Sequence, residues 1–167
     1  RLPQEDCCQA LGVPSTIKYQ NDGGPNMNSI LDLLKGSDEP TKDREDFLKA
    51  QILFWLMAAT DGHAKNYSVF LYPGARYGMT PFYDVISMQP SLDAGQLQAQ
   101  RVKLAMSVGQ NNHYKVSDIV PRHFVQTTKP AGLGAEVVVA IFEDISKRFD
   151  SAWKDVVESL PPGFPEE

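Results

Sequence analysis

The stretch ATDGHAKNYSVFLYPGARYGMTPFYDV (residues 59–85) places a polar hexapeptide, DGHAKN, between an apolar helix and a predicted β-hairpin. The helix is predicted over 41–60, where apolar residues recur at helical spacing. Its second half is apolar almost all round, so we expect its C-terminal end to enter the core. The strand-forming segments 67–72 and 79–84, joined by the turn PGARYG, predict the hairpin. A polar loop held between two regular elements is a usual place for a functional site.

The remainder of the chain is predicted to be mostly helical. Alternating apolar residues at 102–108 indicate one further strand. The last helix can be one element or two, and Asn26 or Asn28 can cap the second. The expected fold class is mainly α (α+β), a single domain over 1–167 made of a helical bundle and a small β-hairpin. Further helices are expected at 3–11, 26–35, 117–128 and 135–160.

Composition limits the classes of function. The net charge of -5 argues against this chain being a major nucleic-acid binder by itself, although a partner protein could bind nucleic acid. The adjacent Cys7 and Cys8 cannot supply a four-ligand zinc site, and we expect two reduced thiols in a reducing cytoplasm. No run of about eighteen apolar residues predicts a membrane span. Because the sequence begins without methionine, we expect a fragment that starts inside a larger protein.

Asp61, Asn66 and Asp84 carry the chemical groups that phosphoryl transfer requires. A carboxylate orients or deprotonates the attacking hydroxyl, and oxygen ligands hold Mg²⁺ against the triphosphate of ATP. In protein kinases the catalytic loop H-R-D-x-x-x-x-N separates the Asp from the Asn by five positions. Asp61 and Asn66 have the same separation. Asp84 is predicted to end the second hairpin strand, as the Asp of D-F-G ends an apolar strand.

The same residues also have purely structural interpretations. Asp61 and Gly62 can form a tight turn, and Asn66 can cap the end of a strand. Lys65 can be a solvated surface lysine. His63 can be a hydrogen-bonded core histidine that supports the loop.

The segments ATDGHAKNYSVFL and TPFYDVIS resemble the HipA family, bacterial serine/threonine kinases that act as toxins in toxin–antitoxin pairs. The segments RLPQEDCCQALGVP, YQNDGGP and KLAMSVG, and the later IVPRHF, also resemble this family, so the resemblance covers the chain up to its last helices. It implies a kinase-like C-terminal lobe whose hairpin carries the metal-binding loop. The D-x-H-x-x-N arrangement is also similar to the loop of phosphoinositide-type kinases.

The resemblance implies roles for individual residues. Asp61 would be the catalytic proton acceptor, and Asn66 and Asp84 would be the Mg²⁺ ligands. A point cation such as Lys65 beside a triphosphate neutralises charge, which agrees with this assignment. The residues implied to contact ATP and its metal are His63, Ala64, Lys65, Asn66, Tyr83 and Asp84.

The resemblance also implies partners. A family member would phosphorylate a protein substrate such as an aminoacyl-tRNA synthetase, inhibit growth and promote persistence. It would form a complex with a HipB-like DNA-binding antitoxin and would contact nucleic acid mainly through that partner.

Two features depart from an ordinary kinase. Asp84 is followed by Val85, Ile86 and Ser87 and not by Phe-Gly. No glycine-rich loop follows a predicted strand and no strand lysine is identifiable, so the N-lobe with its phosphate loop is expected to be absent from 1–167. We therefore expect these residues alone to be inactive and to bind ATP weakly.

Two other classes of function remain open from the sequence. One is a non-catalytic, kinase-like module that docks a DNA-binding antitoxin without transferring phosphate. The other is a Mg²⁺-dependent phosphatase with Asp61 as nucleophile, which would require further acids or a lysine clustered at strand ends.

Overall fold

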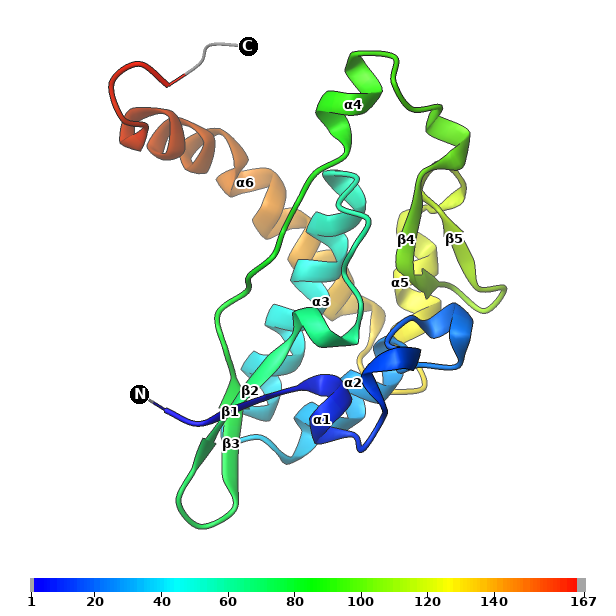
Figure 1. The fold of residues 1–167 in the computed structure, drawn as a ribbon, viewed down its shortest axis with the longest axis vertical. Helices are drawn as coiled ribbons and strands as arrows, with labels where there is room; N and C mark the ends of the chain where they lie inside the picture. Colours follow the sequence, from blue (N-terminus) through cyan, green and yellow to red (C-terminus); the bar gives the residue numbers. More distant parts are fainter. Residues whose placement is uncertain (1, 165–167) are drawn as a thin grey trace.

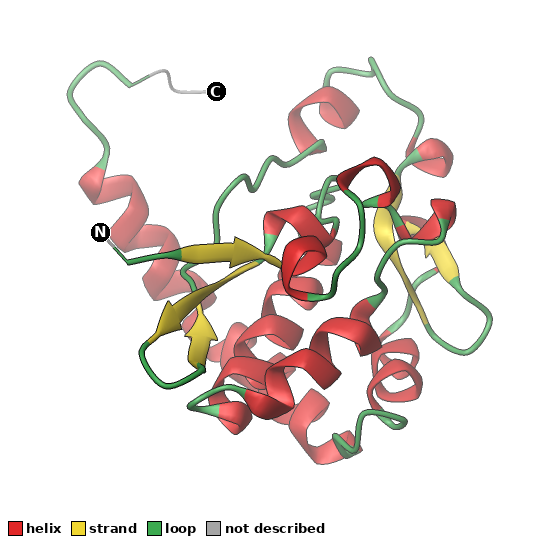
Figure 2. Ribbon diagram, turned by 60° about the horizontal axis from the view of Figure 1, so that its bottom comes forward, coloured by secondary structure: helices red, strands yellow, loops and turns green. Residues whose placement is uncertain are grey.

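The computed structural model describes residues 2–164, and the helix α3 (Pro40–Leu56) lies at their centre (Figure 1). The other helices and two small antiparallel sheets surround it, and the sheets lie on different sides of the helices (Figure 2). The remaining helices are α1 (Cys7–Ala10), α2 (Met27–Leu33), α4 (Gln89–Asp93), α5 (Pro121–Thr128) and α6 (Ala135–Ser159). The strands are β1 (Gln4–Asp6), β2 (Ser68–Tyr72), β3 (Arg76–Met79), β4 (Lys103–Val108) and β5 (His113–Lys115).

Helix α3 confirms the long helix predicted from periodicity, with a shift at its end. Its fully buried residues, which include Phe47 and Ile52, lie in the middle of the helix. Phe54 in the last turn is also buried, but Leu56 and Met57 are exposed, so the C-terminal end enters the core on one face only. The helix stops at Leu56, and Ala58 then adopts a left-handed backbone (φ 50°), which turns the chain toward the polar hexapeptide.

The first sheet has the strand order β1-β2-β3. The helix predicted over 3–11 is wrong in its first half, because residues 4–6 pair with β2, Glu5 lying opposite Val69. Asp6 then caps the short helix α1 through a capping box with Gln9.

The predicted hairpin exists, but its second strand is not 79–84. Strand β3 covers Arg76–Met79, because the turn after β2 is short and includes Gly74 and Ala75 in left-handed conformations. The predicted turn PGARYG therefore places the second strand too late. After Met79 the chain runs without regular structure to Ser87, which bridges back to Ala59.

The second half of the chain follows the prediction more closely. Strand β4 matches the predicted strand, and α6 is one continuous helix. Helix α5 begins at Pro121 and not at residue 117 or 118, where a 3-10 turn (η6, Val116–Asp118) precedes it. Strand β5 and helix α4 are elements that the sequence did not indicate.

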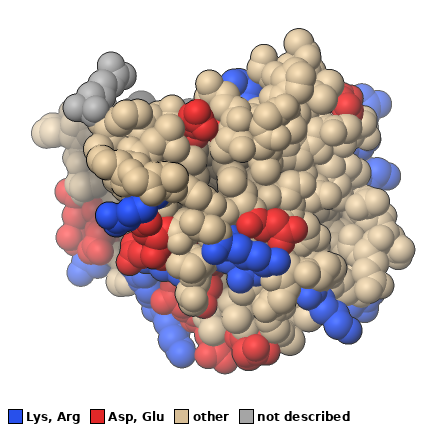
Figure 3. Space-filling model, turned by 90° about the horizontal axis from the view of Figure 1, so that it is seen from below, with Lys and Arg blue, Asp and Glu red and all other residues tan. Residues whose placement is uncertain are grey.

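The charged side chains are interspersed on the visible surface. On the face seen in Figure 3, basic and acidic residues stand next to one another in small groups, without a broad basic area. Among residues 2–164, no helix combines the length and the apolar character needed to cross a bilayer.

Beneath the hexapeptide, a buried polar contact joins α3 to the residue before β2. The Gln51 side-chain amide donates a hydrogen bond to the Tyr67 hydroxyl (2.6 Å), and both residues are almost fully buried. Burial also raises the pKa of Tyr67, so the hydroxyl stays protonated. We expect Tyr67→Phe to lower the free energy of unfolding by about 1–3 kcal/mol, because it leaves a buried amide without a partner. Urea titration followed by circular dichroism measures this loss.

The matched control for that measurement is the double variant Gln51→Leu with Tyr67→Phe. Replacing both partners by apolar groups leaves no orphaned donor, so we expect the double variant to regain much of the lost stability. Equal stability of Tyr67→Phe and the wild type would show that the hydrogen bond contributes nothing.

Candidate active site

The hexapeptide forms a closed corner between α3 and β2. The backbone N–H of His63 donates to the Asp61 carbonyl (2.8 Å), and that of Asn66 donates to the His63 carbonyl (2.9 Å). The buried Asn66 side chain donates from Nδ2 to the same Asp61 carbonyl (2.6 Å). This contact between positions five apart fixes the loop, and among residues 2–164 the Asn66 Oδ1 atom accepts no hydrogen bond.

Asp61 presents its carboxylate at the surface of this corner. Its side chain is 50% exposed, and one oxygen accepts a hydrogen bond from the Tyr19 hydroxyl (2.9 Å). That hydrogen bond, together with burial and the Asp61 charge, raises the pKa of Tyr19, so the hydroxyl remains a donor. The carboxylate is thus oriented from one side and still accessible to a ligand.

His63 lies beneath the loop and is 4% exposed. Its Nε2 atom is 3.8 Å from Asp61 Oδ1, which is too long for a hydrogen bond, and its buried Nδ1 has no partner among the described residues. The Tyr19 ring packs edge-on against the imidazole, with centroids 4.9 Å apart. A histidine that supports the loop by packing fits this geometry, whereas a fully hydrogen-bonded core histidine does not.

Burial lowers the pKa of His63 below its ordinary value of 6.5, and the nearby Asp61 carboxylate offsets only part of this effect. The unfolded chain therefore binds a proton on this residue at a higher pH than the folded chain does. We expect the contribution of His63 to stability to be complete above pH 6.5 and to be lost as the pH falls below it, with a slope of at most about 1.4 kcal/mol per pH unit.

Urea titrations between pH 7.5 and pH 5 test this expectation, with His63→Gln as the comparison. The variant should lose part of the pH dependence and keep the remainder, because His123 is also buried and its pKa is likewise lowered by burial. Identical pH dependence in the two proteins would contradict the assignment.

Lys65 and Tyr83 link the hexapeptide to its neighbours. The Lys65 ammonium forms an ion pair with Asp6 (2.6 Å), which ties the loop to β1. The Tyr83 hydroxyl donates to the Lys65 carbonyl (2.8 Å) and shares a hydrogen bond with Ser68 (2.6 Å). The lysine is therefore partly exposed but paired, and not simply solvated. Ala64 is completely buried, so only its backbone could contact a ligand.

Asp84 follows the anchored Tyr83 directly. It does not end a strand as predicted, because β3 ends at Met79. Its backbone is left-handed (φ 57°), an uncommon conformation for a residue other than glycine, and such residues occur often at functional sites. The charge of Asp61 and, more weakly, that of Asp84 oppose the lowering of the His63 pKa by burial.

The donor set at this corner fits Mg²⁺ in its chemistry. Magnesium binds oxygen ligands and keeps several waters, so one or two carboxylates together with substrate phosphates are sufficient. Asp84, Asp61 and the free Oδ1 of Asn66 are such oxygen donors. Within residues 2–164, no cluster of three or more His, Cys, Asp or Glu residues could hold a metal alone.

Residues 1–153 match the protein family described as the HipA-like C-terminal domain. The chain belongs to this family. It is 32% identical over 169 residues to the protein named "Putative kinase Y4mE" of Sinorhizobium fredii. It is 26% identical over 170 residues to the serine/threonine-protein kinase toxin HipA of Shewanella oneidensis. Both relatives are thus named as kinases.

The HipA-like domain spans only part of these relatives. The alignments cover 91% and 94% of this chain but 38% and 37% of the respective relatives. In structure it resembles a chain of the Shewanella oneidensis complex of HipA, HipB and operator DNA, with a TM-score of 0.83 at 24% identity. That match covers 99% of this chain and 39% of the other, and it confirms the predicted fold class, mainly helical with small antiparallel sheets.

Two contacts of the HipA-like domain's corner were not found from the sequence. The segment YQNDGGP resembles the family, but the sequence assigns no role to Tyr19, which lies 42 positions from Asp61. The segment that contains Asp6 resembles the family as well, and Asp6 lies 59 positions from Lys65. Spacing could reveal neither contact, because both depend on the fold.

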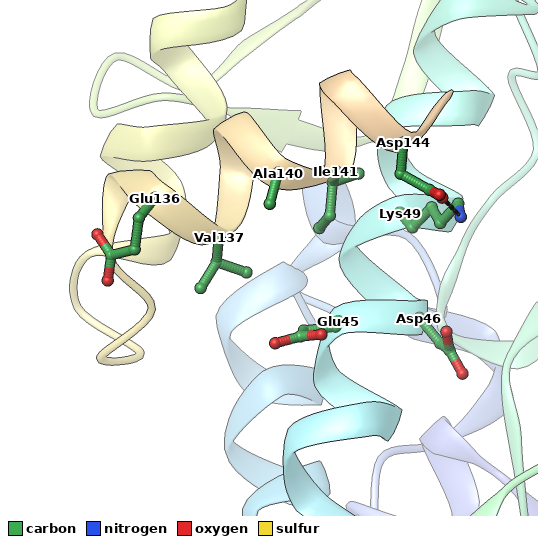
Figure 4. Close-up of a pocket in the computed structure, with 8 residues that line it drawn as sticks. All are labelled: Glu45, Asp46, Lys49, Glu136, Val137, Ala140, Ile141 and Asp144. Atoms are coloured by element: carbon green, nitrogen blue, oxygen red, sulfur yellow. Dashed lines mark hydrogen bonds and ion pairs between the residues drawn. The ribbon is translucent and has the colours of Figure 1, made fainter. Parts of the chain in front are cut away.

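A different hollow lies between α3 and α6 and shares no residue with the corner (Figure 4). It has a volume of about 530 Å³, and an ion pair between Lys49 and Asp144 crosses one end. Its remaining charges are acidic, which suits neither ATP nor another phosphate ligand. The hollow therefore does not compete with the corner as a nucleotide site.

Proposed function

We propose that this chain is the C-terminal lobe of a HipA-type serine/threonine-protein kinase, which transfers the γ-phosphate of ATP to a protein. The observation that carries the proposal is the closed loop from Asp61 to Asn66, with an accessible carboxylate at one end and a free amide oxygen at the other. Family membership and the kinase names of the relatives support it.

Asp61 would accept the proton of a Ser or Thr hydroxyl. The hydroxyl oxygen would form a bond to the γ-phosphorus while the bond from that phosphorus to the β–γ bridging oxygen breaks, and ADP would leave with the electron pair. The hydrogen bond from Tyr19 would hold the Asp61 carboxylate in one orientation during this step. General bases of this kind accelerate reactions by about 10²–10⁴-fold.

Asn66 and Asp84 would hold the magnesium ion. When bound, Mg²⁺ neutralises phosphate charge during the transfer. Asn66 is suited to this because its Nδ2 is fixed on the Asp61 carbonyl, which leaves Oδ1 for a cation. The left-handed backbone of Asp84 would orient its carboxylate toward the magnesium ion. The free energy of metal binding would offset the strain of this backbone conformation.

The other nucleotide contacts are proposed from the same corner. The Lys65 ammonium has donors beyond the one on Asp6 and would contact phosphate together with the backbone of His63 and Ala64. Tyr83, fixed by Ser68 and the Lys65 carbonyl, would flank the nucleotide.

The remaining parts of the active site would come from outside residues 1–167. The chain covers 37–38% of the two relatives, and we identify no phosphate loop in it. A group of apolar side chains near the corner is exposed and could pack against an N-lobe. Its members are Leu56, Met57, Phe82, Val85 and Ile86. The isolated residues 1–167 are therefore expected to be inactive.

The proposed partners follow from the family. In the Shewanella oneidensis complex HipA assembles with HipB and operator DNA. We propose that this protein binds a HipB-like antitoxin and that the antitoxin makes the main contacts with nucleic acid. The proposed substrate is a cytoplasmic protein such as an aminoacyl-tRNA synthetase, whose modification would inhibit growth and promote persistence.

The test uses the protein expressed from its whole reading frame, γ-labelled ATP and a mixture of Ser- and Thr-containing peptides. We expect labelled peptide and ADP in the presence of Mg²⁺, no labelled peptide after addition of EDTA, and recovery with excess Mg²⁺. Neither ADP nor labelled peptide under any condition would contradict the kinase proposal and favour the non-catalytic docking module.

A further inference from the structure

A groove of about 390 Å³ adjoins the hexapeptide, because Tyr19, which lines it, donates a hydrogen bond to Asp61. One wall is the 3-10 turn η2 (Gln20–Asp22) with the preceding Tyr19, and the other is β4 with Tyr114 of β5. Thr60, the residue before Asp61, also lines the groove. The groove does not include the residues proposed to hold Mg²⁺ and ATP.

The segment YQNDGGP, of which the proposed function uses only Tyr19, builds the first wall. The N–H of Gly24 donates to the Tyr19 carbonyl (2.9 Å), and Gly23 has a left-handed backbone (φ 90°). A side chain at Gly24 would lie 2.1 Å from the Ile17 carbonyl oxygen, so the turn can close only with glycine there. The two glycines therefore hold Tyr19 in its position against Asp61 and His63.

The two walls are fastened to each other. The Gln20 side chain accepts a hydrogen bond from the Ser107 N–H (2.9 Å) and donates one to the Ser107 hydroxyl (2.7 Å). The groove is thus formed before any ligand arrives, as binding sites for specific ligands usually are.

The lining of the groove is mixed in character. Tyr19 and Tyr114 offer aromatic surface, while Asp22 and Lys103 offer opposite charges. Both charged side chains are exposed, and neither forms an ion pair within residues 2–164. Aromatic surface with a few placed polar groups suits a peptide segment, whose backbone and side chains need both kinds of contact. A nucleotide is disfavoured by the Asp22 carboxylate.

We propose that this groove binds the acceptor segment of the protein substrate and delivers its Ser or Thr hydroxyl to Asp61. Tyr19 joins the two functions, because its ring lines the groove while its hydroxyl orients the carboxylate. Lys103 selects an acidic residue near the acceptor, and Asp22 selects a basic one. This inference rests on the proposed kinase function. It adds the binding site of the substrate's acceptor segment and the charges preferred beside the acceptor Ser or Thr.

The test compares two charge reversals in the protein expressed from its whole reading frame. Lys103→Glu changes the groove, and Lys129→Glu is the matched control, because Lys129 is an exposed lysine at the end of α5 that does not line the groove. Both lysines are exposed, so neither change removes a buried group, and thermal unfolding midpoints verify the fold. The probe is a positional-scanning library of Ser/Thr peptides with Mg-ATP.

The wild type and Lys129→Glu are expected to prefer an acidic residue at one position relative to the acceptor, by about 10-fold for one desolvated charge pair. Lys103→Glu is expected to reverse this preference to a basic residue at the same position. If all three proteins phosphorylate the library with the same preference, the groove is overturned as the acceptor site while the kinase function stands. If the wild type forms neither ADP nor phosphopeptide, the kinase function itself fails.

Discussion

The Asp61→Asn protein is expected to transfer phosphate about 10³-fold more slowly than the wild type, and to bind Mg-ATP with an affinity within a few-fold of it. The amide keeps the shape of the side chain and can still accept the hydrogen bond from the Tyr19 hydroxyl. The backbone carbonyl that fixes Asn66 is unchanged. What is lost is the capacity to take up the hydroxyl proton.

The measurement is the initial rate of label transfer from ATP, made beside the affinity for a non-hydrolysable ATP analogue. Asp93→Asn is the control, because Asp93 is an exposed acid on α4 whose carboxylate accepts a hydrogen bond from Gln89 and has no contact with the corner. A rate for Asp61→Asn equal to that of the control would show that the base lies elsewhere.

Gly62→Ala is expected to lower the free energy of unfolding by about 1–3 kcal/mol and to displace Asp61. The added Cβ would lie 2.5 Å from Cδ2 of Phe54 and 2.9 Å from the Tyr67 hydroxyl, and both residues are buried. Neither ring can move away without disturbing the core, so the loop itself must shift. Urea titration gives the stability, and phosphoryl transfer gives the functional loss.

Gly78→Ala in β3 is the matched control. There the nearest heavy atom to an added Cβ is 3.7 Å away, which is an ordinary contact. We expect this variant to retain its stability to within about 0.5 kcal/mol, because alanine costs less conformational entropy than glycine. Equal stability of the Gly62 and Gly78 variants would mean that the hexapeptide is loosely packed on α3.

The elements that the sequence predicted well are those with local signals. The period of apolar residues marked α3 and α6, and the composition of residues 68–72 marked β2. The closure of the hexapeptide also has a local signal, since the five-residue separation of Asp61 and Asn66 matches the hydrogen bond that closes the loop.

The features that the sequence could not predict depend on distant partners. Residues 4–6 look helical alone and form a strand only because β2 offers them an edge. The hairpin strand was placed too late because Gly74 and Ala75 turn the chain early, and Asp84 therefore lies in an irregular segment. Lys65 looked solvated or phosphate-binding until the fold placed Asp6 beside it.

The site shows how the fold combines these local and distant signals. The hexapeptide supplies Asp61 and Asn66, whereas YQNDGGP supplies the tyrosine that orients the acid. β1 supplies the partner of Lys65, and the segment after β3 supplies Tyr83 and Asp84. Four separate stretches of the chain therefore meet at one corner, and only the hexapeptide carries a recognisable spacing.

The claim that this corner serves phosphoryl transfer is tested most directly by intact mass spectrometry. The protein from the whole reading frame is incubated with Mg-ATP and a Ser/Thr peptide library, and the masses of protein and peptides are followed with the amounts of ATP and ADP. We predict that peptides or protein gain one phosphate on a serine or threonine as an equal amount of ADP appears. Unchanged masses and unchanged ATP, or removal of phosphate from a phosphorylated peptide without ATP, would contradict the account.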